Sequence, residues 1–273
     1  MKQYTVIILL VTLISVFSPD AGAKDYVTYK PEISIPLTSA GFSVWMLGEI
    51  FKGSLAPERC RFCRKNFLDE EVKNILSWGR KRNAADMWSN VFLVSIPLVG
   101  LGSLSLSGRD MWDSSDTAEE TGKAALVYFE SLSVAMLLNQ VVKFIVARER
   151  PIVRHLSGSE KDRPDTRLSF YSGHTTAAFA MATAGSMLLQ MKEWKYSNAA
   201  WVVNMSLAAT VGYLRIAADK HYFSDVVIGA LIGIAAGIIV PKLHEIKESD
   251  TQKKSFQITM PAPLYMFSIG TAF

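Results

Sequence analysis

Three short clusters of basic and histidine residues carry the chemistry that this sequence suggests. They are KFIVARERP at 143–151, FYSGH at 170–174 and LRIAADKHYFSD at 214–225. Lys143, Arg150 and Arg215 supply the positive charge and the paired N–H donors that a phosphoryl group requires. His174 and His221 add two side chains that can act as acid, base or nucleophile near neutral pH. Together these residue types predict a pocket for a phosphate group.

The order and spacing of the clusters resemble the signature of the type-2 phosphatidic acid phosphatase superfamily, which also contains bacterial acid phosphatases and vanadium haloperoxidases. That signature reads K-x6-RP, then P-SGH, then SR-x5-H-x3-D. This sequence keeps the Lys to Arg-Pro spacing, the SGH triplet and the R-x5-H-x3-D spacing. Tyr171 replaces the usual proline and Leu214 replaces the usual small residue. Neither replaced residue performs chemistry in the family, so the departures concern substrate fit and loop shape.

The resemblance implies a role for each motif residue. By analogy, His221 attacks phosphorus to form a phosphohistidine, Asp225 holds the His221 ring in the tautomer that frees the attacking nitrogen, and His174 protonates the departing oxygen. Water then hydrolyses the intermediate with His174 as base. The expected phosphate-binding residues are Lys143, Arg150, Ser172, Gly173 and Arg215, with Ser172 and Gly173 using backbone N–H groups at a helix start. We expect no metal and no cofactor.

Each of these residues also has a plainer interpretation when taken singly. A lone His or Arg in a loop is usually solvated, and Lys143 could extend its ammonium group from an apolar helix to an interface. Their joint spacing favours the catalytic interpretation. Outside the motifs, we expect His155 and His244 to be structural or exposed. The other arginines of the loop between the first two motifs could extend the anion field or pair with the acidic residues of that loop, and we expect them to belong to a solvated loop of mixed charge. These are Arg148, Arg154, Arg163 and Arg167.

Long apolar segments rich in Ala, Leu, Met and Gly dominate the chain and favour helices over strands. They are Ile35–Phe51, Trp88–Gly108, Ala124–Val142, Thr175–Met191, Ala199–Leu214 and Val226–Val240. We therefore expect an all-α fold, a six-helix bundle of the kind that the resemblance implies. The expected parts are a signal peptide at 1–23, a segment with the first helix and a basic loop at 24–85, the helical core at 86–245 and a tail at 246–273.

The predicted helices explain how distant motifs can share one pocket. Lys143 follows one apolar segment and the SGH triplet opens the next, so both lie at the same end of neighbouring antiparallel helices. The stretch from His174 to Arg215 is long enough for one helix out and one helix back, at about 1.5 Å per residue. We therefore expect the site at one end of the bundle.

The N-terminus is typical of an exported protein. Lys2 precedes an apolar run from Tyr4 to Phe17, and a small-residue cleavage pattern follows at Ala21–Ala23. An uncleaved anchor helix is the alternative, although the run is shorter than the roughly 20 residues that span a bilayer. Cys60 and Cys63 lack the further ligands that a zinc site needs, and in an oxidising compartment they could form a short-loop disulfide.

The bundle is expected to be embedded in a membrane or associated with one, because the uncharged stretch Trp88–Gly108 can cross the hydrocarbon core. The orientation of the bundle in the membrane follows less directly from the sequence. If Ile35–Phe51 spans, the basic loop Gly53–Ala85 prefers the cytoplasm, and the site would lie there too. Export and the resemblance favour the periplasm. We expect the protein in the inner membrane or the periplasm, with the site facing the periplasm. The charge of the loop Gly53–Ala85 indicates the opposite orientation.

Composition narrows the range of functions. The chain of 273 residues is 49% apolar, which excludes disorder, and its net charge of +4 is too small to indicate nucleic acid binding. The motifs and the resemblance they carry imply a metal-independent histidine phosphatase of the cell envelope, which acts on a phosphate monoester or diphosphate and above all on one carried by a lipid. The alternatives are a soluble periplasmic acid phosphatase acting on small phosphate esters, a vanadium-dependent haloperoxidase and a non-enzymatic scaffold.

Overall fold

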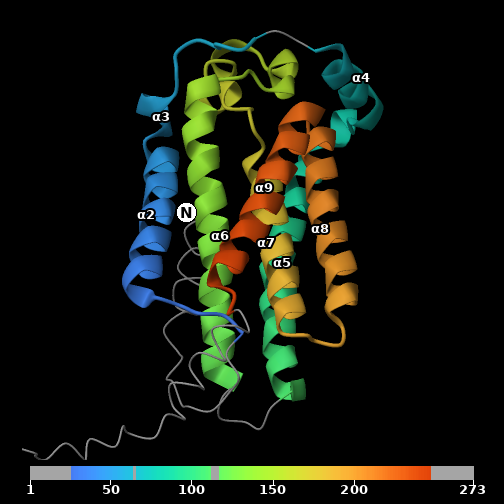
Figure 1. Cartoon of the computed structure of the whole chain (residues 1–273). Coiled ribbons are helices and arrows are strands. Elements are labelled where there is room, and N and C mark those ends of the chain that lie inside the picture. The colour runs from blue at the N-terminus through green and yellow to red at the C-terminus, as the bar shows by residue number, and fades with distance from the viewer. Residues whose placement is uncertain (1–25, 64–65, 112–116, 247–273) are drawn as a thin grey trace, which may run out of the picture.

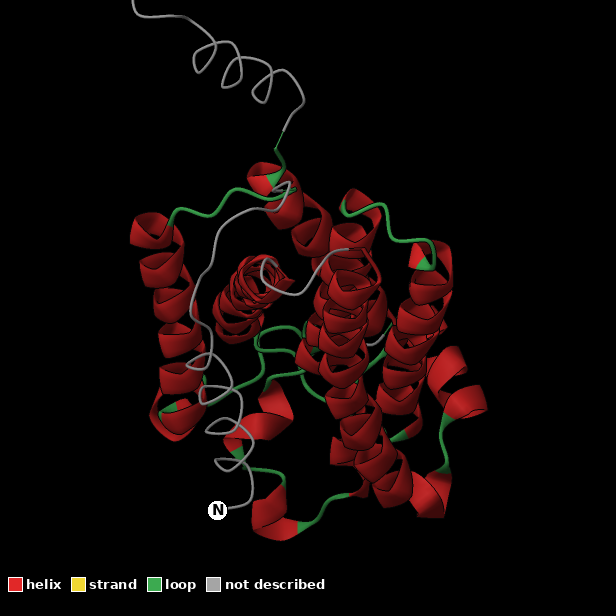
Figure 2. Cartoon of the chain, turned by 90° about the horizontal axis from the view of Figure 1, so that it is seen from below, coloured by secondary structure: helices red, strands yellow, loops and turns green. Residues whose placement is uncertain are grey.

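The computed structural model describes residues 26–63, 66–111 and 117–246, and every regular element in these ranges is a helix (Figure 1). The expected signal peptide at 1–23 lies outside the described residues. So does the expected tail, apart from residue 246. An all-α fold is confirmed for the described part of the chain. Seen from below, one long helix is viewed almost along its axis while others run lengthwise across the view, so the long helices are inclined to one another (Figure 2).

Six long helices correspond to the six predicted apolar segments. They are α2 (Pro31–Ile50), α5 (Arg82–Met111), α6 (Thr117–Val146), α7 (Gly173–Met191), α8 (Ser197–Ala217) and α9 (Phe223–His244). Four 3-10 turns lie between them: η2 (Gly79–Lys81), η3 (Pro151–His155), η4 (Gly158–Glu160) and η5 (Pro164–Arg167). The long helices alternate in direction along the chain, apart from the excursion between α2 and α5 (Figure 1).

Two shorter helices form where the sequence indicated a basic loop, so the described chain has eight α-helices and the predicted count of six is not confirmed. They are α3 (Lys52–Leu55) and α4 (Phe67–Leu76). At the start of α4 the Asn66 side chain accepts a hydrogen bond from the Leu68 N–H, and Asp69 adds a negative charge to the first turn. Both features stabilise the positive end of a helix.

Helix α7 is the centre of the bundle and packs against α5, α6, α8 and α9. Its contact with α9 is close because three glycines of α9 face it. A Cβ on Gly229 would lie 2.9 Å from the Ser172 carbonyl oxygen, and one on Gly233 would lie 2.6 Å from that of Thr176. Small residues at this spacing let two helix backbones approach. The approach brings the start of α9 next to the start of α7.

Five helices are long and apolar enough to cross a membrane: α2, α5, α6, α8 and α9. Large apolar side chains cover the outside of the bundle. Leu98 of α5 and Val202 of α8 are each 69% exposed, and Leu231 of α9 is 56% exposed. Helices that are apolar on their outward faces as well as their inward faces suit a lipid surrounding. The fold therefore agrees with the expected membrane association.

Candidate active site

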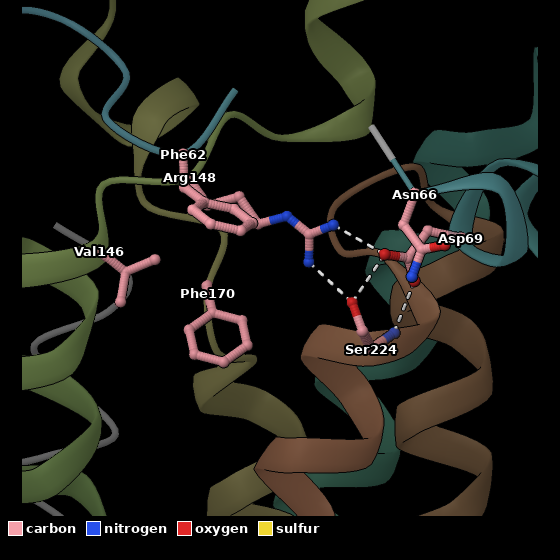
Figure 3. Close-up of a pocket in the computed structure, with 7 residues that line it drawn as sticks. All are labelled: Phe62, Asn66, Asp69, Val146, Arg148, Phe170 and Ser224. Atoms are coloured by element: carbon pink, nitrogen blue, oxygen red, sulfur yellow. Dashed lines mark hydrogen bonds and ion pairs between the residues drawn. The ribbon is translucent and has the colours of Figure 1, made fainter. Parts of the chain in front are cut away.

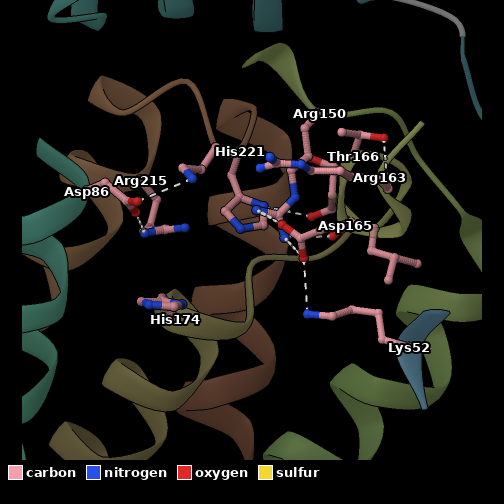
Figure 4. Close-up of polar contacts among 12 residues, drawn as sticks. Lys52, Asp86, Arg150, Arg163, Asp165, Thr166, His174, Arg215 and His221 are labelled. Carbon is pink, nitrogen blue, oxygen red and sulfur yellow. Dashed lines mark hydrogen bonds and ion pairs between the residues drawn. The ribbon is translucent and has the colours of Figure 1, made fainter. Parts of the chain in front are cut away.

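The three motif clusters come together at one end of the bundle. Lys143 lies in the last turn of α6 and Arg150 in the loop that follows. His174 lies in the first turn of α7, Arg215 in the last turn of α8, and His221 in the turn between α8 and α9. In Figure 4 the rings of His174 and His221 lie on opposite sides of a space that is flanked by Arg215 and, across it, by Asp165 and Arg150.

The ring of His221 is buried and is held by a hydrogen bond at its Nδ1 atom. Its Nδ1 lies 2.7 Å from the carbonyl oxygen of Ser169. A carbonyl oxygen only accepts hydrogen bonds, so Nδ1 carries the proton and Nε2 keeps its lone pair. The Oδ2 atom of Asp225 lies further away, 3.8 Å from Nδ1. The direct bond that the resemblance implied between Asp225 and the ring is therefore replaced by a bond to Ser169.

Asp225 acts on His221 through its neighbours. Its Oδ2 accepts a hydrogen bond from the Ser169 hydroxyl at 2.6 Å and another from the Tyr222 N–H at 2.9 Å. The second bond belongs to a capping box at the start of α9. Ser169 therefore contacts both Asp225 and His221. No feature of the sequence singled out Ser169, because it lies three residues before the SGH triplet with no motif of its own.

Arg148 is buried, so the expectation of a solvated loop residue is wrong. One guanidinium nitrogen lies 2.5 Å from Asp225 Oδ1 and 2.8 Å from the Ser224 hydroxyl, and the other lies 2.7 Å from Asp69 Oδ2. Figure 3 shows the guanidinium reaching across to Ser224 and Asp69. The partners come from α4 and α9, both far from Arg148 in sequence. The loop arrangement that brings them together could not be read from local charge pattern.

A cavity of about 350 Å³ lies beside this guanidinium. Its apolar wall is formed by Phe62, Val146 and Phe170, and its polar wall includes Asp69, Arg148 and Ser224 (Figure 3). The residues that line the cavity include neither His174 nor His221.

Each of the expected phosphate-binding cations is paired with a carboxylate. The nitrogen to oxygen distances are 3.0 Å for Lys143 to Glu49, 3.1 Å for Arg150 to Asp165 and 2.6 Å for Arg215 to Asp86. Lys52 of α3 adds a further cation beside Glu49 at 2.7 Å and Asp165 at 3.4 Å. An incoming phosphate would therefore exchange places with carboxylates that already neutralise these cations.

The backbone N–H groups at the start of α7, in the SGH triplet, differ from the expectation that both Ser172 and Gly173 would bind phosphate. The Ser172 N–H donates to the backbone oxygen of Asp225 at 3.1 Å, so it is not free for a phosphate. Gly173 opens α7, where the first-turn N–H groups have no partner within the helix. A Cβ on Gly173 would lie 2.9 Å from the Asn139 Oδ1 atom. The glycine is therefore needed for packing against α6, and its N–H remains aimed out of the helix end.

Three residues of α5 complete the site and were not predicted to belong to it. Arg215 donates to Asp86 and to the Ser89 hydroxyl at 2.9 Å, and His174 Nε2 lies 2.8 Å from Asn90 Oδ1. Asp86, Ser89 and Asn90 follow an i, i+3, i+4 spacing that marks one helix face. Three polar residues at this spacing, directly before an apolar run, were the signal that could have identified them.

The electrostatic surroundings keep both histidines neutral in the free site. Burial lowers the pKa of His221 from 6.5 to about 4, and the charges of Arg150 and Arg215 add to the effect. Burial and the charge of Arg215 likewise lower the pKa of His174 well below its usual value. Burial raises the pKa of Asp165, but Arg150 and Lys52 outweigh it, so the pKa lies well below its usual value.

The two departures from the family signature have packing roles. Tyr171 is buried, and its carbonyl oxygen accepts a hydrogen bond from the Asn139 amide at 2.7 Å. Leu214 is buried in a small apolar cluster with Ala85 of α5. Of the other two histidines, His155 lies 3.5 Å from Asp219. His244 lies 3.2 Å from Glu130 at the opposite end of the bundle.

Cys60 and Cys63 are joined by a disulfide bond. Their loop is attached to the site by its backbone. The Arg61 N–H donates to the Ala147 carbonyl oxygen at 3.1 Å, and Phe62 and Arg148 form an isolated parallel β-bridge. Within the described residues, no group of three or more His, Cys, Asp or Glu side chains is arranged to hold a metal ion.

In the described residues, fold and site together define an all-helical protein with five helices apolar enough to cross a membrane and with two histidines and three paired cations at one end of the bundle. A protein-family model described as "PAP2 superfamily" matches residues 124–248, which include all three motif clusters. Residues 124–248 are therefore similar to the PAP2 superfamily, the family that the motif spacing resembles.

Similar proteins include phospholipid phosphatase 2 of Homo sapiens, which is 25% identical over 165 residues that cover 47% of this chain and 57% of that protein. Lipid A 1-phosphatase of Porphyromonas gingivalis is 39% identical over 99 residues, 36% of this chain and 21% of that protein. The chain spans about half the length of the curated relatives that it matches. A transmembrane PAP2-type phosphatidylglycerolphosphate phosphatase from Bacillus subtilis aligns with a TM-score of 0.46 and 19% identity, over 74% of this chain and 94% of that one.

Proposed function

We propose that this protein is a phosphatase of the cell envelope that removes phosphate from a lipid through a phosphohistidine on His221. The observation that carries the proposal is the meeting of His174, His221 and three cations at one end of a helical bundle. The lipid substrate is supported by the names of two relatives, a phospholipid phosphatase and a lipid A 1-phosphatase. The five apolar helices support a site close to a membrane surface.

The first chemical step is a transfer of the phosphoryl group to the protein. The lone pair on Nε2 of His221 attacks phosphorus while the bond from phosphorus to the leaving oxygen breaks. His174 gives its proton to that oxygen. As the His221 ring becomes positive, the Ser169 carbonyl and the Asp225 carboxylate stabilise it. Arg150, Arg215 and Lys143 neutralise the charge on the equatorial phosphate oxygens.

His174 must be protonated to act as this acid, although burial and the nearby cations keep it neutral in the free site. A phosphate dianion bound beside the ring brings negative charge close to it, so substrate binding itself favours protonation of His174. In the second step water attacks phosphorus, His174 takes the proton of that water, and the bond from phosphorus to Nε2 breaks. Inorganic phosphate and free His221 result.

The test is phosphate release by the purified full chain in detergent. The substrates are phosphatidic acid, a lipid diphosphate and p-nitrophenyl phosphate, each with and without EDTA. We expect release that EDTA does not abolish and that vanadate inhibits, because vanadate adopts the five-coordinate geometry of the transition state. Loss of activity in EDTA that a divalent ion restores would refute the metal-independent mechanism. Release from the soluble ester alone would favour an acid phosphatase, and halide-dependent peroxidation a haloperoxidase.

We further propose that the site faces the periplasm after export. The disulfide supports this orientation, because the Cys60–Cys63 loop is attached to the site and disulfides persist in oxidising compartments. The basic residues between α2 and α5 lie at the same end and argue for the cytoplasm (Figure 1). The exposed Ser157 offers a direct test as Ser157→Cys in a chain whose two cysteines are replaced. Labelling of intact cells by a reagent that crosses only the outer membrane is expected, and labelling only after the inner membrane is opened contradicts the proposal.

A further inference from the structure

We propose that Arg148 and Asp69 are positioning residues that hold Asp225 and Ser169 in place behind His221. The inference rests on the proposed function, because it takes His221 as the group that attacks phosphorus. The side-chain hydrogen bonds of Arg148 and Asp69 run to each other, to Ser224 and, from Arg148, to Asp225. Their effect reaches the reaction only through the contacts described below.

The Arg148 guanidinium is held by two carboxylates and an aromatic ring. Its two terminal nitrogens bind Asp225 and Asp69 at 2.5 and 2.7 Å, and its carbon lies 4.4 Å from the centre of the Tyr222 ring. The Arg148 side chain is only 6% exposed, and those of Asp69 and Asp225 are 1% and 0% exposed. A planar fork with two charge-assisted bonds has little freedom to turn. Asp225 is therefore presented in one orientation.

That orientation is passed on to the nucleophile. The second oxygen of Asp225 receives the Ser169 hydroxyl at 2.6 Å, and the Ser169 carbonyl receives the His221 Nδ1–H at 2.7 Å. A continuous chain of contacts thus runs from Asp69 to the attacking ring. Without Arg148, Asp225 would be a buried carboxylate with no counter-charge, a costly state that it would leave by moving or by taking up a proton. Either change disturbs Ser169 and the ring.

The chain itself offers a matched control. Arg154 and Glu70 form an ion pair between the same loop and the same helix α4, one residue further along that helix. Their side chains are 29% and 23% exposed. Arg154 also contacts the Tyr222 side chain, but neither residue forms the ion pairs that Arg148 makes with Asp69 and Asp225. Loss of the Arg154–Glu70 pair tests the attachment of α4 to the loop and leaves both ion pairs of Arg148 in place.

The cavity beside Arg148 allows a further test by chemical rescue. Because this cavity of about 350 Å³ is lined by Arg148, Asp69 and Ser224, a guanidinium ion can enter the space that Arg148→Ala leaves. Urea has a similar planar shape but no charge. Rescue by guanidinium and not by urea would show that the missing group acts through its charge and hydrogen bonds at this position.

The experiment measures kcat and KM of the full chain in detergent with p-nitrophenyl phosphate. We expect Arg148→Ala to lower kcat by about 10–100-fold, the usual size of the effect when a residue that orients a reacting side chain is lost. KM should change by less than about twofold. Arg148→Lys should recover part of the loss, and millimolar guanidinium should raise the kcat of Arg148→Ala at least about fivefold. Arg154→Ala should stay within about twofold of wild type, and guanidinium should not rescue His221→Ala.

Several results would overturn the inference. They are an Arg148→Ala kcat within twofold of wild type, a loss confined to KM, an equal loss in Arg154→Ala, or equal rescue by urea. If Arg148→Ala does not fold, Asp69→Asn decides: a kcat lowered at least about threefold with an unchanged melting temperature supports the inference, and a wild-type kcat refutes it. If the wild-type chain itself has no phosphatase activity, the proposed function is refuted. If the wild-type chain is active and one of the results above is found, the inference about Arg148 and Asp69 alone is refuted.

Discussion

The two sides of His221 are built in different ways. Behind the ring, Asp225, Arg148 and Asp69 form ion pairs whose side chains are at most 6% exposed. In front, the carboxylates that neutralise the cations are partly open to solvent, and Asp165 is 47% exposed. A buried pair cannot lose a partner without a large cost, whereas an exposed pair contributes little and exchanges readily. The rear therefore suits permanent support, and the front suits exchange with a substrate anion.

The largest expected effect comes from His221, where the two sides meet. We predict that His221→Ala lowers kcat by about 10⁴-fold or more, because it removes the atom that bonds to phosphorus. The measurement is phosphate release, together with ³²P labelling of the protein from labelled substrate. Far-UV circular dichroism should match wild type. An active variant would show that another group is the nucleophile.

The next effect concerns the front of the site alone. We predict that His174→Ala lowers kcat by about 10²–10³-fold for an alkyl phosphate, whose leaving oxygen needs a proton. For an aryl phosphate with an acidic leaving group the loss should be less than about tenfold, since little protonation is required. The two rates are compared within the same variant. Equal losses on both substrates would contradict the role of His174 as general acid.

A smaller effect, in the opposite direction, is expected from the exposed front carboxylate. We predict that Asp165→Asn lowers KM by about three- to fivefold, because a substrate phosphate no longer competes with a carboxylate for Arg150. Glu160→Gln is the control, since Glu160 pairs with the exposed Arg163 in the same loop. A raised KM in Asp165→Asn would mean that Asp165 orients Arg150 for the substrate instead of competing with it.

The smallest effect is a pH dependence of stability. The pKa of His221 is about 4 in the folded protein and near 6.5 when unfolded, so between these values the unfolded chain binds more protons. The contribution of His221 to stability is therefore complete above pH 6.5 and is lost as the pH falls towards 4. We expect the melting temperature in detergent to fall by a few degrees from pH 7 to pH 4.5, and to fall less in His221→Gln, at about 2–4 °C per kcal/mol. Identical slopes would contradict the low pKa.

The motif residues and the long helices were predictable from the sequence, because both leave local signals. Each of the six apolar segments overlaps a long helix, and the segment lengths put Lys143, His174 and Arg215 at one end, as the structure has them. Helix α4 and the burial of Arg148 were not predictable in this way. The segment containing α4 is charged and short, and its helix is stabilised by Asn66 and by contacts of Asp69 with Arg148 and Ser224.

The sequence by itself therefore determined the types of the reacting groups, their order and the helices that carry them, since periodicity and motif spacing act over a few residues. Only the tertiary structure decided which groups meet. The partners of Arg148, Arg215 and Lys143 lie 77 to 129 positions away in the chain. Pairings of that length depend on how α2, α4, α5 and α9 pack around α7, and on which buried charges must find a counter-charge there.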